Sequence, residues 1–402
     1  MTRPISLGQF CHYSGFVNET TMTSSRRDAS RRSVWSRIAA ARVGGTAAAI
    51  LILVGQAQAT GVSTLGAATG YNAFIFSNFT SYGTDSEGKV AVGGNFAPSS
   101  GGFTVASTHS ADKAGAYDLV VGGNYTNTYV SVGGGDIFVG GNMNWNTPTL
   151  PNNAYVNGNV TNTGWGSVGG TIYYAGSYSS VGTLNATKVK TPTAAPIDFL
   201  GAQTSLQNLS STLASQTANT TINVAYNTYT MTGNDKTLNV FNLADSSFNG
   251  STINISAPSG STVVVNVAGK ADSFNGGSIN YSGVTAANVI FNFNSAQTLA
   301  LAAIAFNGTI LAPYATVNGN YGQLNGQLIA NNLAGTTELH DVLFSGTLPG
   351  GSTTTTTTSS QTAATPEPST WLLVLGSVLF SLGTMRKERV AVLARAFVRR
   401  SR

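Results

Sequence analysis

Residues 240–293 read VFNLADSSFNGSTINISAPSGSTVVVNVAGKADSFNGGSINYSGVTAANVIFNF, and this stretch decides the fold. An asparagine recurs between two apolar residues at positions 242, 254, 266, 280 and 292, so that successive intervals are 12, 12, 14 and 12 residues. Because side chains alternate across a β-strand, each asparagine faces one side and its apolar neighbours face the other. The even spacing predicts strands that stack in register, one rung above another, with asparagines that hydrogen-bond along the stack.

A second repeat unit precedes this stretch and combines a short strand with a turn. It reads Val-Gly-Gly-Asn at 92–95, 121–124 and 139–142, Val-Asn-Gly-Asn at 156–159 and Val-Gly-Gly at 168–170. The glycine pair allows a turn with positive φ, and the neighbouring valine and aromatic residues favour a strand. Further Asn-Gly turn signals stand at 307–308, 318–319 and 325–326.

Together these repeats predict a mainly β fold, a parallel β-solenoid with short strands and a turn at each corner. A β-sandwich is the alternative, since it also uses short strands at regular spacing. One segment interrupts the pattern. In residues 196–216, Ile197, Leu200, Leu206, Leu209 and Leu213 recur at helical spacing, and Pro196 and Asp198 suit a helix start. We expect one amphipathic helix packed alongside the β-stack, with these apolar residues as its core face.

The first 59 residues have the layout of a secretory signal peptide. Six arginines between 26 and 42 precede the apolar run 46–54, and Ala57-Gln58-Ala59 forms a small-x-small cleavage site at Ala57 and Ala59. Met22 is a second candidate start, and the arginine pairs also allow a twin-arginine export route. We expect residues 1–59 to form a signal helix that directs export.

The C-terminal residues 366–402 repeat these features in reverse order. Pro366, Glu367 and Pro368 precede an apolar helix predicted over 369–385, and Arg386, Lys387 and Arg389 follow it. Such a helix is just long enough to cross a thin bilayer, and the basic cluster should remain cytoplasmic. The order resembles the PEP-CTERM sorting signal, and this resemblance implies recognition and processing by an exosortase. The tail continues to Arg402, further than is usual in that family, and a plain transmembrane anchor is the alternative.

Charge and composition between the two ends exclude several classes. Residues 60–367 hold six lysines, no arginine and twelve acids, so the net charge is 6 − 12 = −6, and no nucleic-acid footprint remains. Cys11 is the single cysteine and precedes the predicted cleavage site, so the exported domain has no disulfide and no thiolate metal site. Residues 350–365 form a Ser/Thr-rich linker.

Several segments of 60–349, taken in order, resemble the choice-of-anchor A domain. They include Tyr71–Phe76, Thr84–Asn95, the Val-Gly-Gly-Asn repeats, Gly308–Ala315, Leu324–Ala330 and the close from Glu338 to Pro349. The resemblance covers roughly 65–349 and implies an extracellular, surface-attached domain with no defined chemistry. Leu348-Pro349-Gly350-Gly351 lacks the threonine of a sortase site, so the PEP-type tail is the expected anchor.

Candidate chemistry in the domain is sparse, and we predict no catalytic residue, no metal site and no cofactor. His340-Asp341 beside Glu338 could serve as a base, but no nucleophile motif accompanies the pair. Asp85 and Glu87 could bind Ca²⁺, although Asp85 capping backbone amides in a turn is favoured. Aromatic rings beside amides suit sugar faces, which marks four possible binding residues: Trp145, Trp165, Tyr173 and Tyr174.

These observations predict an exported, surface-anchored structural or adhesive protein, associated with exopolysaccharide or extracellular matrix and anchored in the membrane before processing. An ice- or carbohydrate-binding β-solenoid is the alternative, by analogy of fold. A polysaccharide-acting enzyme is the third interpretation, weakened by the few acids and the missing arginines.

Overall fold

The computed structural model describes residues 65–99, 102–127, 129–146, 149–244 and 246–349. The predicted signal peptide with Ala57 and Ala59, the Ser/Thr-rich linker and the sorting tail, including both terminal helices, lie outside the described residues. In the described part of the chain, no helix has the length and apolarity that a membrane crossing requires.

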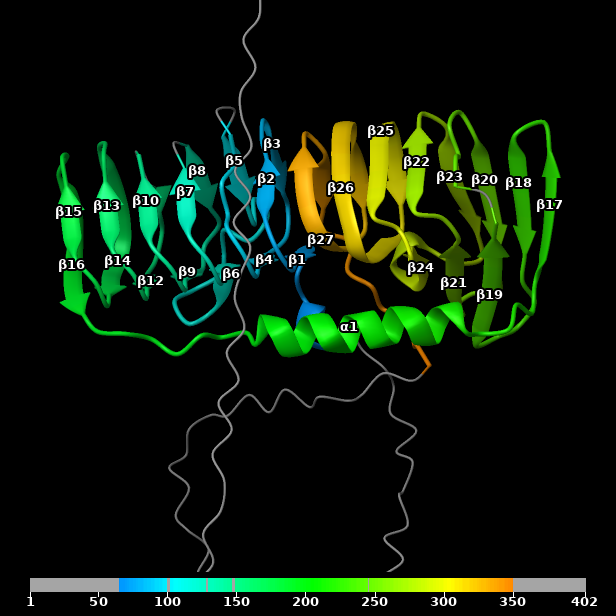
Figure 1. Cartoon of the computed structure of the whole chain (residues 1–402), viewed down its shortest axis with the longest axis horizontal. Helices are drawn as coiled ribbons and strands as arrows, with labels where there is room; N and C mark the ends of the chain where they lie inside the picture. Colours follow the sequence, from blue (N-terminus) through cyan, green and yellow to red (C-terminus); the bar gives the residue numbers. More distant parts are fainter. Residues whose placement is uncertain (1–64, 100–101, 128, 147–148, 245, 350–402) are drawn as a thin grey trace, which may run out of the picture. The chain divides into compact units, whose positions relative to one another are not determined.

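The described residues form a parallel β-solenoid with three faces, called A, B and C in the order in which each coil visits them (Figure 1). Nearly all strand pairs are parallel, and the antiparallel pair found in the described residues joins β17 to β18. This pairing excludes the β-sandwich alternative, whose sheets are antiparallel. The predicted solenoid is therefore confirmed.

Face A begins with the first strand and carries one strand from each coil. Its strands in the first half of the chain are β1 (Ala73–Ile75), β4 (Val90–Val92), β6 (Tyr117–Val121), β9 (Asp136–Val139), β12 (Ala154–Val156), the end of β14 (Gly166–Tyr174) and the end of β16 (Leu184–Lys190). The second half adds β19 (Leu238–Leu243), β21 (Thr262–Val267), β24 (Val289–Asn292) and the starts of β26 (Thr309–Asn325) and β27 (Leu328–Gly335).

Faces B and C follow face A around each coil. Face B holds β2 (Phe79–Ser81), β7 (Tyr125–Asn127), β10 (Met143–Trp145), β13 (Val160–Asn162), β15 (Tyr178–Ser180), β22 (Ala271–Asn275), the start of β25 (Thr298–Asn307), the middle of β26 and the end of β27. Face C holds β3 (Thr84–Ser86), β5 (Phe103–Val105), β8 (Val130–Val132), β11 (Thr149–Leu150), β17 (Thr221–Ala225), β18 (Thr228–Thr232), β20 (Thr252–Ser256), β23 (Ser278–Ser282), β28 (Glu338–His340), the starts of β14 and β16 and the ends of β25 and β26.

The chain enters the solenoid at its middle, a feature that the repeats did not predict. Strand β1 lies between β4, which follows it, and β27, which comes some 250 residues later, with Ala73 opposite both Val90 and Leu328. The first half winds from β1 outward to β16, and the second half winds from β17 at the other end back to β27 and β28 (Figure 1). One continuous stack therefore consists of two separately wound halves that pair at the centre.

Inward side chains from all three faces fill the solenoid with an apolar core. Aromatic rings stack from coil to coil, with Phe96 between Phe79 and Tyr125 at ring-centroid distances of 4.9 and 5.5 Å. In the second half Phe248 stacks on Phe274 at 4.7 Å. Each fully buried ring of this size contributes roughly 1.5–3 kcal/mol, which lets the domain dispense with disulfides.

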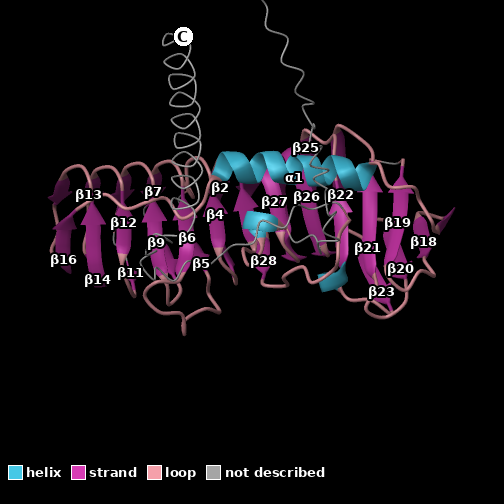
Figure 2. Ribbon diagram, turned by 90° about the horizontal axis from the view of Figure 1, so that it is seen from below, coloured by secondary structure: helices cyan, strands magenta, loops and turns pink. Residues whose placement is uncertain are grey.

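Helix α1 (Phe199–Ala214) carries the chain between the two halves and covers part of face A (Figure 2). The Asp198 side chain caps it by accepting a hydrogen bond from the Gly201 amide at 3.0 Å, as the helix-start signal predicted. Leu206, Leu209 and Leu213 are buried against face A, which confirms the predicted apolar side of the helix. Leu200 is 75% exposed and does not belong to that side, which corrects the predicted set. Two short 3₁₀ helices, η1 (Gly66–Ala68) and η2 (Ala286–Asn288), complete the described elements.

The asparagines at intervals of 12 and 14 residues form two columns rather than the single ladder predicted. Asn242, Asn266 and Asn292 stack on face A with separations of 24 and 26 residues, and we call them the helix-side column. Asn254 and Asn280 stack on face C, 26 residues apart. The coils that carry these asparagines are 24 or 26 residues long, so the sequence interval corresponds to half a coil and successive asparagines point from different faces.

Candidate functional site

Face B presents one row of short, outward side chains that continues across both halves. In spatial order the row reads Ser179, Thr161, Asn144, Thr126, Ala97, Thr80, Ala334, Asn318, Ala300 and Ser273. These are Ser, Thr, Asn and Ala residues, and among the described face B strands no outward side chain carries a charge. The charged side chain on these strands, Asp272, points inward and is 2% exposed.

This row is flat and regular because the parallel strands fix the spacing and direction of each side chain. Neighbouring parallel strands lie about 4.8 Å apart, so a short side chain recurs along the row at that interval. The inward neighbours are large and buried, for example Tyr125, Met143 and Trp145, and they hold each strand at its place on the core. No side chain of the row is long enough to cover the next one. Face B is therefore a rigid surface of hydroxyl, amide and methyl groups.

A ladder of asparagines borders face B along its corner with face A. We call Asn78, Asn95, Asn124, Asn142 and Asn159 the corner ladder. Each side-chain oxygen accepts a hydrogen bond from the backbone amide of the equivalent residue in the next coil, as from Asn142 N to Asn124 Oδ1 at 2.8 Å and from Asn159 N to Asn142 Oδ1 at 2.9 Å. The ladder ends at Ser177, whose amide donates to Asn159 Oδ1 at 2.8 Å. It also crosses the junction of the halves, since the Asn78 amide donates to Asn332 Oδ1 at 3.0 Å.

The glycines before the corner ladder are explained by close packing and not by positive φ, which corrects the turn prediction. Positive φ values occur at other glycines, and none of the Val-Gly-Gly-Asn glycines is among them. A Cβ atom on Gly122 would lie 2.4 Å from the Gly93 carbonyl oxygen, and one on Gly140 would lie 2.3 Å from that of Gly122. Glycine stacks on glycine at this corner because a side chain would collide with the backbone of the adjacent coil. Val168-Gly-Gly differs from the other repeats, because it lies inside β14 where the coil passes from face C to face A.

The four aromatic residues predicted for binding are dispersed over the solenoid. Trp145 is 1% exposed and belongs to the core, so its ring is not available to a ligand. Trp165 is 71% exposed at the corner between faces B and C. Tyr173 stacks on Tyr155 with centroids 4.8 Å apart on face A, and Tyr174 packs partly buried against the core. The four therefore form no common site.

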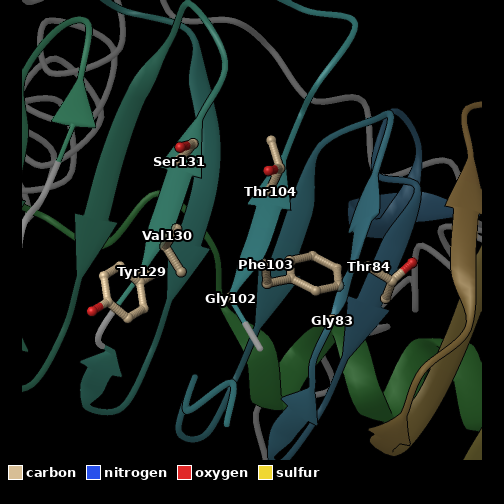
Figure 3. A pocket seen from close by; sticks show the side chains of 8 residues that line it. All are labelled: Gly83, Thr84, Gly102, Phe103, Thr104, Tyr129, Val130 and Ser131. Carbon is tan, nitrogen blue, oxygen red and sulfur yellow. The ribbon is translucent and has the colours of Figure 1, made fainter. Parts of the chain in front are cut away.

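A hollow of about 340 Å³ opens at the same corner as Trp165 (Figure 3). It is lined by Gly83, Thr84, Gly102, Phe103, Thr104, Tyr129, Val130 and Ser131, from three successive coils. Phe103 and Val130 face the core, while the Thr104 and Ser131 side chains point outward. Tyr129 was not among the four predicted binding residues, because nothing in the sequence shows that two glycines stack beside it.

The titratable residues form ion pairs and hydrogen bonds that join the coils to the loop after β5. His109 Nε2 lies 2.9 Å from Asp341 Oδ2, so the partner of Asp341 is His109 and not its sequence neighbour His340. His340 instead approaches Glu338 at 3.4 Å. The Asp341 amide donates to Glu87 Oε2 at 3.0 Å. These contacts attach the C-terminal end of the described domain to its first coils.

Lys89 forms the centre of a second ionic cluster. Its ammonium lies 2.5 Å from Asp112 and 3.4 Å from the buried Asp118. Burial alone lowers the pKa of Lys89, but the hydrogen bond to Asp112 and the charge of Asp118 outweigh this and raise it. Burial raises the pKa of Asp118 to about 6. The hydrogen bond from Lys89 lowers the pKa of Asp112. The lysine is therefore held as a cation, which suits a structural ion pair and not a nucleophile.

The two acidic residues considered for calcium binding, Asp85 and Glu87, make other contacts in the structure. Asp85 lies on strand β3, not in a turn, and accepts a hydrogen bond from Ser107 Oγ at 2.7 Å, so it does not cap backbone amides as favoured. Glu87 binds the Asp341 amide. Across the ranges that the structure describes, no three His, Cys, Asp or Glu residues converge to hold a metal ion.

Comparison with known proteins places this geometry in a family. Residues 64–154 and 144–341 match a family model described as "Putative Ice-binding-like adhesive domain". No curated protein matches the chain. Among solved structures, an ice-binding protein from an Antarctic biological consortium is 15% identical over 71% of this chain and 91% of its own, with a TM-score of 0.33. An ice-binding protein from an Antarctic Flavobacteriaceae bacterium is 13% identical over 72% of this chain and 99% of its own, with a TM-score of 0.23.

Proposed function

Because the chain belongs to the family of ice-binding-like adhesive domains, we propose that it is an exported adhesive module that binds the surface of ice crystals through face B. The observation that carries this proposal is the uncharged row of short side chains along face B, continuous across both halves. An ice surface is neutral and periodic. A protein face that binds it must be flat, regular and free of charges that hold their own hydration water.

Rigidity is the second requirement, and the corner ladder supports it. Each hydroxyl, amide or methyl group on face B contributes little on its own, so binding depends on presenting many groups at once. A surface that is already ordered loses less conformational entropy on binding. Successive amide-to-asparagine hydrogen bonds of 2.8–3.1 Å hold the coils in register beside face B.

The ends of the described domain lie where a tether would leave face B accessible. Leu65 and Leu348 are both buried in the apolar cluster formed by face A and α1. Both ends of the described residues therefore lie on the helix side and away from face B. The proposal includes the predicted signal peptide, the Ser/Thr-rich linker and the PEP-CTERM-type tail as the means of export and exosortase-dependent attachment. It gives the domain an adhesive role at the cell surface and no catalytic one.

The test compares bulky substitutions on two faces of the purified full chain. Thr80→Tyr places a large ring in the centre of the face B row, and Thr230→Tyr places the same ring on an exposed position of face C. We expect the unmodified chain and Thr230→Tyr to partition into a slowly growing ice hemisphere, and Thr80→Tyr to be left in the liquid. Exclusion of the unmodified chain from ice, or equal uptake of both variants, would contradict the proposal.

A further inference from the structure

The corner between faces B and C carries a line of residues that stack one above another, which we call the B–C ridge. In spatial order it runs through Tyr321, Thr336, Gly83, Gly102, Tyr129 and Trp165, with one coil between the last two. Hydrogen bonds agree with this order, since the Gly83 amide donates to the Gly102 carbonyl at 2.8 Å and the Tyr321 amide donates to the side-chain Oγ1 of Thr336 at 3.1 Å.

Three aromatic side chains project from this ridge. Tyr321, Tyr129 and Trp165 are 75%, 61% and 71% exposed, although aromatic residues elsewhere in the solenoid are mostly core. An exposed aromatic ring offers an apolar plane at the surface, which suits the CH-lined face of a sugar ring. Their common position on one corner means that a single extended ligand could lie across all three.

The spacing of the rings follows the coil interval. Tyr129 and Trp165 are two coil steps apart, which corresponds to about 10 Å for parallel strands. Tyr321 and Tyr129 are four steps apart, or about 19 Å. All three rings therefore stand at multiples of two coils. In an extended β-1,4-linked glycan the same sugar face recurs at every second residue, over a length similar to two coils.

The part of the ridge between Tyr321 and Tyr129 contains the hollow of about 340 Å³. Figure 3 shows the residues that line this hollow. Gly83 and Gly102 make this gap, and a Cβ on Gly83 would meet no atom within 4 Å. Thr104 and Ser131 line the hollow, and their outward hydroxyl groups lie beside it. A saccharide in the gap would find hydrogen-bond partners for its own hydroxyls at the side of the stacking rings.

Charge restricts the ligand class further. The outward carboxylates Asp85 and Glu338 lie on adjacent strands of face C next to the ridge, and the ridge residues themselves include no cation. An anionic polysaccharide would be repelled by these carboxylates, whereas neutral sugars can donate hydroxyl hydrogens to them.

From the ring spacing, the hollow and the charge, we propose that the B–C ridge binds a neutral, β-linked polysaccharide chain lying along the solenoid axis. Tyr321, Tyr129 and Trp165 stack on sugar rings, and the hollow receives the sugars between the first two. This site is separate from face B, so the domain has one surface for ice and another for a matrix glycan.

The test is affinity electrophoresis of the purified full chain in gels containing hydroxyethyl cellulose, a neutral β-1,4-glucan. Parallel gels contain pullulan, a neutral α-glucan, or alginate, an anionic polysaccharide. The double variant Tyr129→Ala/Trp165→Ala removes two rings. Tyr226→Ala removes a fully exposed ring at the far end of β17 and serves as the matched control. Trp165→Phe retains a ring at the ridge.

We expect hydroxyethyl cellulose to retard the unmodified chain, Tyr226→Ala and Trp165→Phe, with the dissociation constant of the double variant at least tenfold higher. Thermal melting and ice uptake of the double variant should match the unmodified chain, which separates loss of this site from misfolding and from loss of face B. No retardation of the unmodified chain, equal retardation of the double variant, or equal retardation by pullulan or alginate would each overturn the proposal.

Discussion

The two halves of the solenoid use asparagine in different ways. In the first half the corner ladder is exposed, and each side chain accepts a hydrogen bond from the backbone of a coil 17, 18 or 29 residues later. In the second half Asn266 and Asn292 of the helix-side column are buried beneath α1, and the side chains of the column hydrogen-bond one another across coils of 24 and 26 residues. The same residue thus maintains register at an exposed corner and satisfies polar groups beneath a helix.

The surroundings of the two sets explain this difference. At the exposed corner between faces A and B, glycine stacks on glycine and an asparagine fixes the turn. In the second half, α1 packs on face A. Asn266 Nδ2 donates to the Leu213 carbonyl at 2.9 Å and Asn292 Nδ2 to the Ser210 carbonyl at 2.8 Å, which docks the helix through its own backbone.

The largest effect that separates the halves should come from glycine. Gly140→Ala puts a methyl group 2.3 Å from the Gly122 carbonyl oxygen, so two coils must move apart, and we expect a loss of about 3 kcal/mol or more. Gly276→Ala in the second half meets no atom within 4 Å and has only its φ of +67° to accommodate, for about 1–2 kcal/mol. Urea unfolding of both variants measures the difference, and equal losses would show that close stacking is not the reason for these glycines.

Asparagine substitutions should follow in size. Asn292→Ala removes a fully buried amide that donates to Ser210 O and Asn266 Oδ1, and it leaves both acceptors buried without that partner, for about 2–3 kcal/mol. Asn124→Ala removes one exposed hydrogen bond with the Asn142 amide, for about 0.5–1.5 kcal/mol. The comparison uses the free energy of unfolding of each variant. A larger loss for Asn124→Ala would mean that the exposed ladder, and not the buried column, carries the greater share of stability.

A smaller, pH-dependent effect should come from Asp272 in the second half. Burial raises the pKa of Asp272 from its ordinary value of 3.8 to about 6, and neither carboxylate oxygen has a hydrogen-bond partner among the described residues. The folded state then binds more protons than the unfolded state between these two pKa values, so this group's stabilising contribution falls as pH rises from about 4 to about 6.

Asp272→Asn tests this dependence by removing the titrating group. We expect the difference in melting temperature between variant and unmodified chain to become about 2–6 °C more favourable to the variant on going from pH 4 to pH 7. Melting curves at both values measure it, and the change in the difference cancels the contributions of the other carboxylates. A difference that is independent of pH would mean that Asp272 titrates alike in the folded and unfolded states.

Much of this fold could be predicted from residue patterns. Strands ending at Val92, Val121 and Val139 follow from the short apolar run before each glycine pair, and α1 follows from the leucine spacing and Asp198. The pairing of β1 with β27 could not be predicted, because no local pattern records which distant strand fills an open edge. For the same reason the sequence did not show that the 12-residue interval spans half a coil, so that successive asparagines lie on different faces.

The candidate sites were less accessible to sequence reasoning. Face B consists of Ser, Thr, Asn and Ala residues that are common throughout the chain, and only the register shows that they share one row. Trp165 was selected from its chemistry alone, together with Trp145, whose burial the sequence does not reveal. The position of Tyr129 beside the hollow depends on its register with Gly102 and Gly83, which lie 27 and 46 residues earlier in the chain.

Both halves should contribute to one continuous ice-binding surface, and thermal hysteresis of two single variants measures this. Asn144→Tyr alters face B in the first half, and Ala300→Tyr alters the equivalent row in the second half. We predict thermal hysteresis for the unmodified chain and its loss in both variants, with melting temperatures unchanged. Full hysteresis in either variant, or none in the unmodified chain, would contradict a shared ice-binding face.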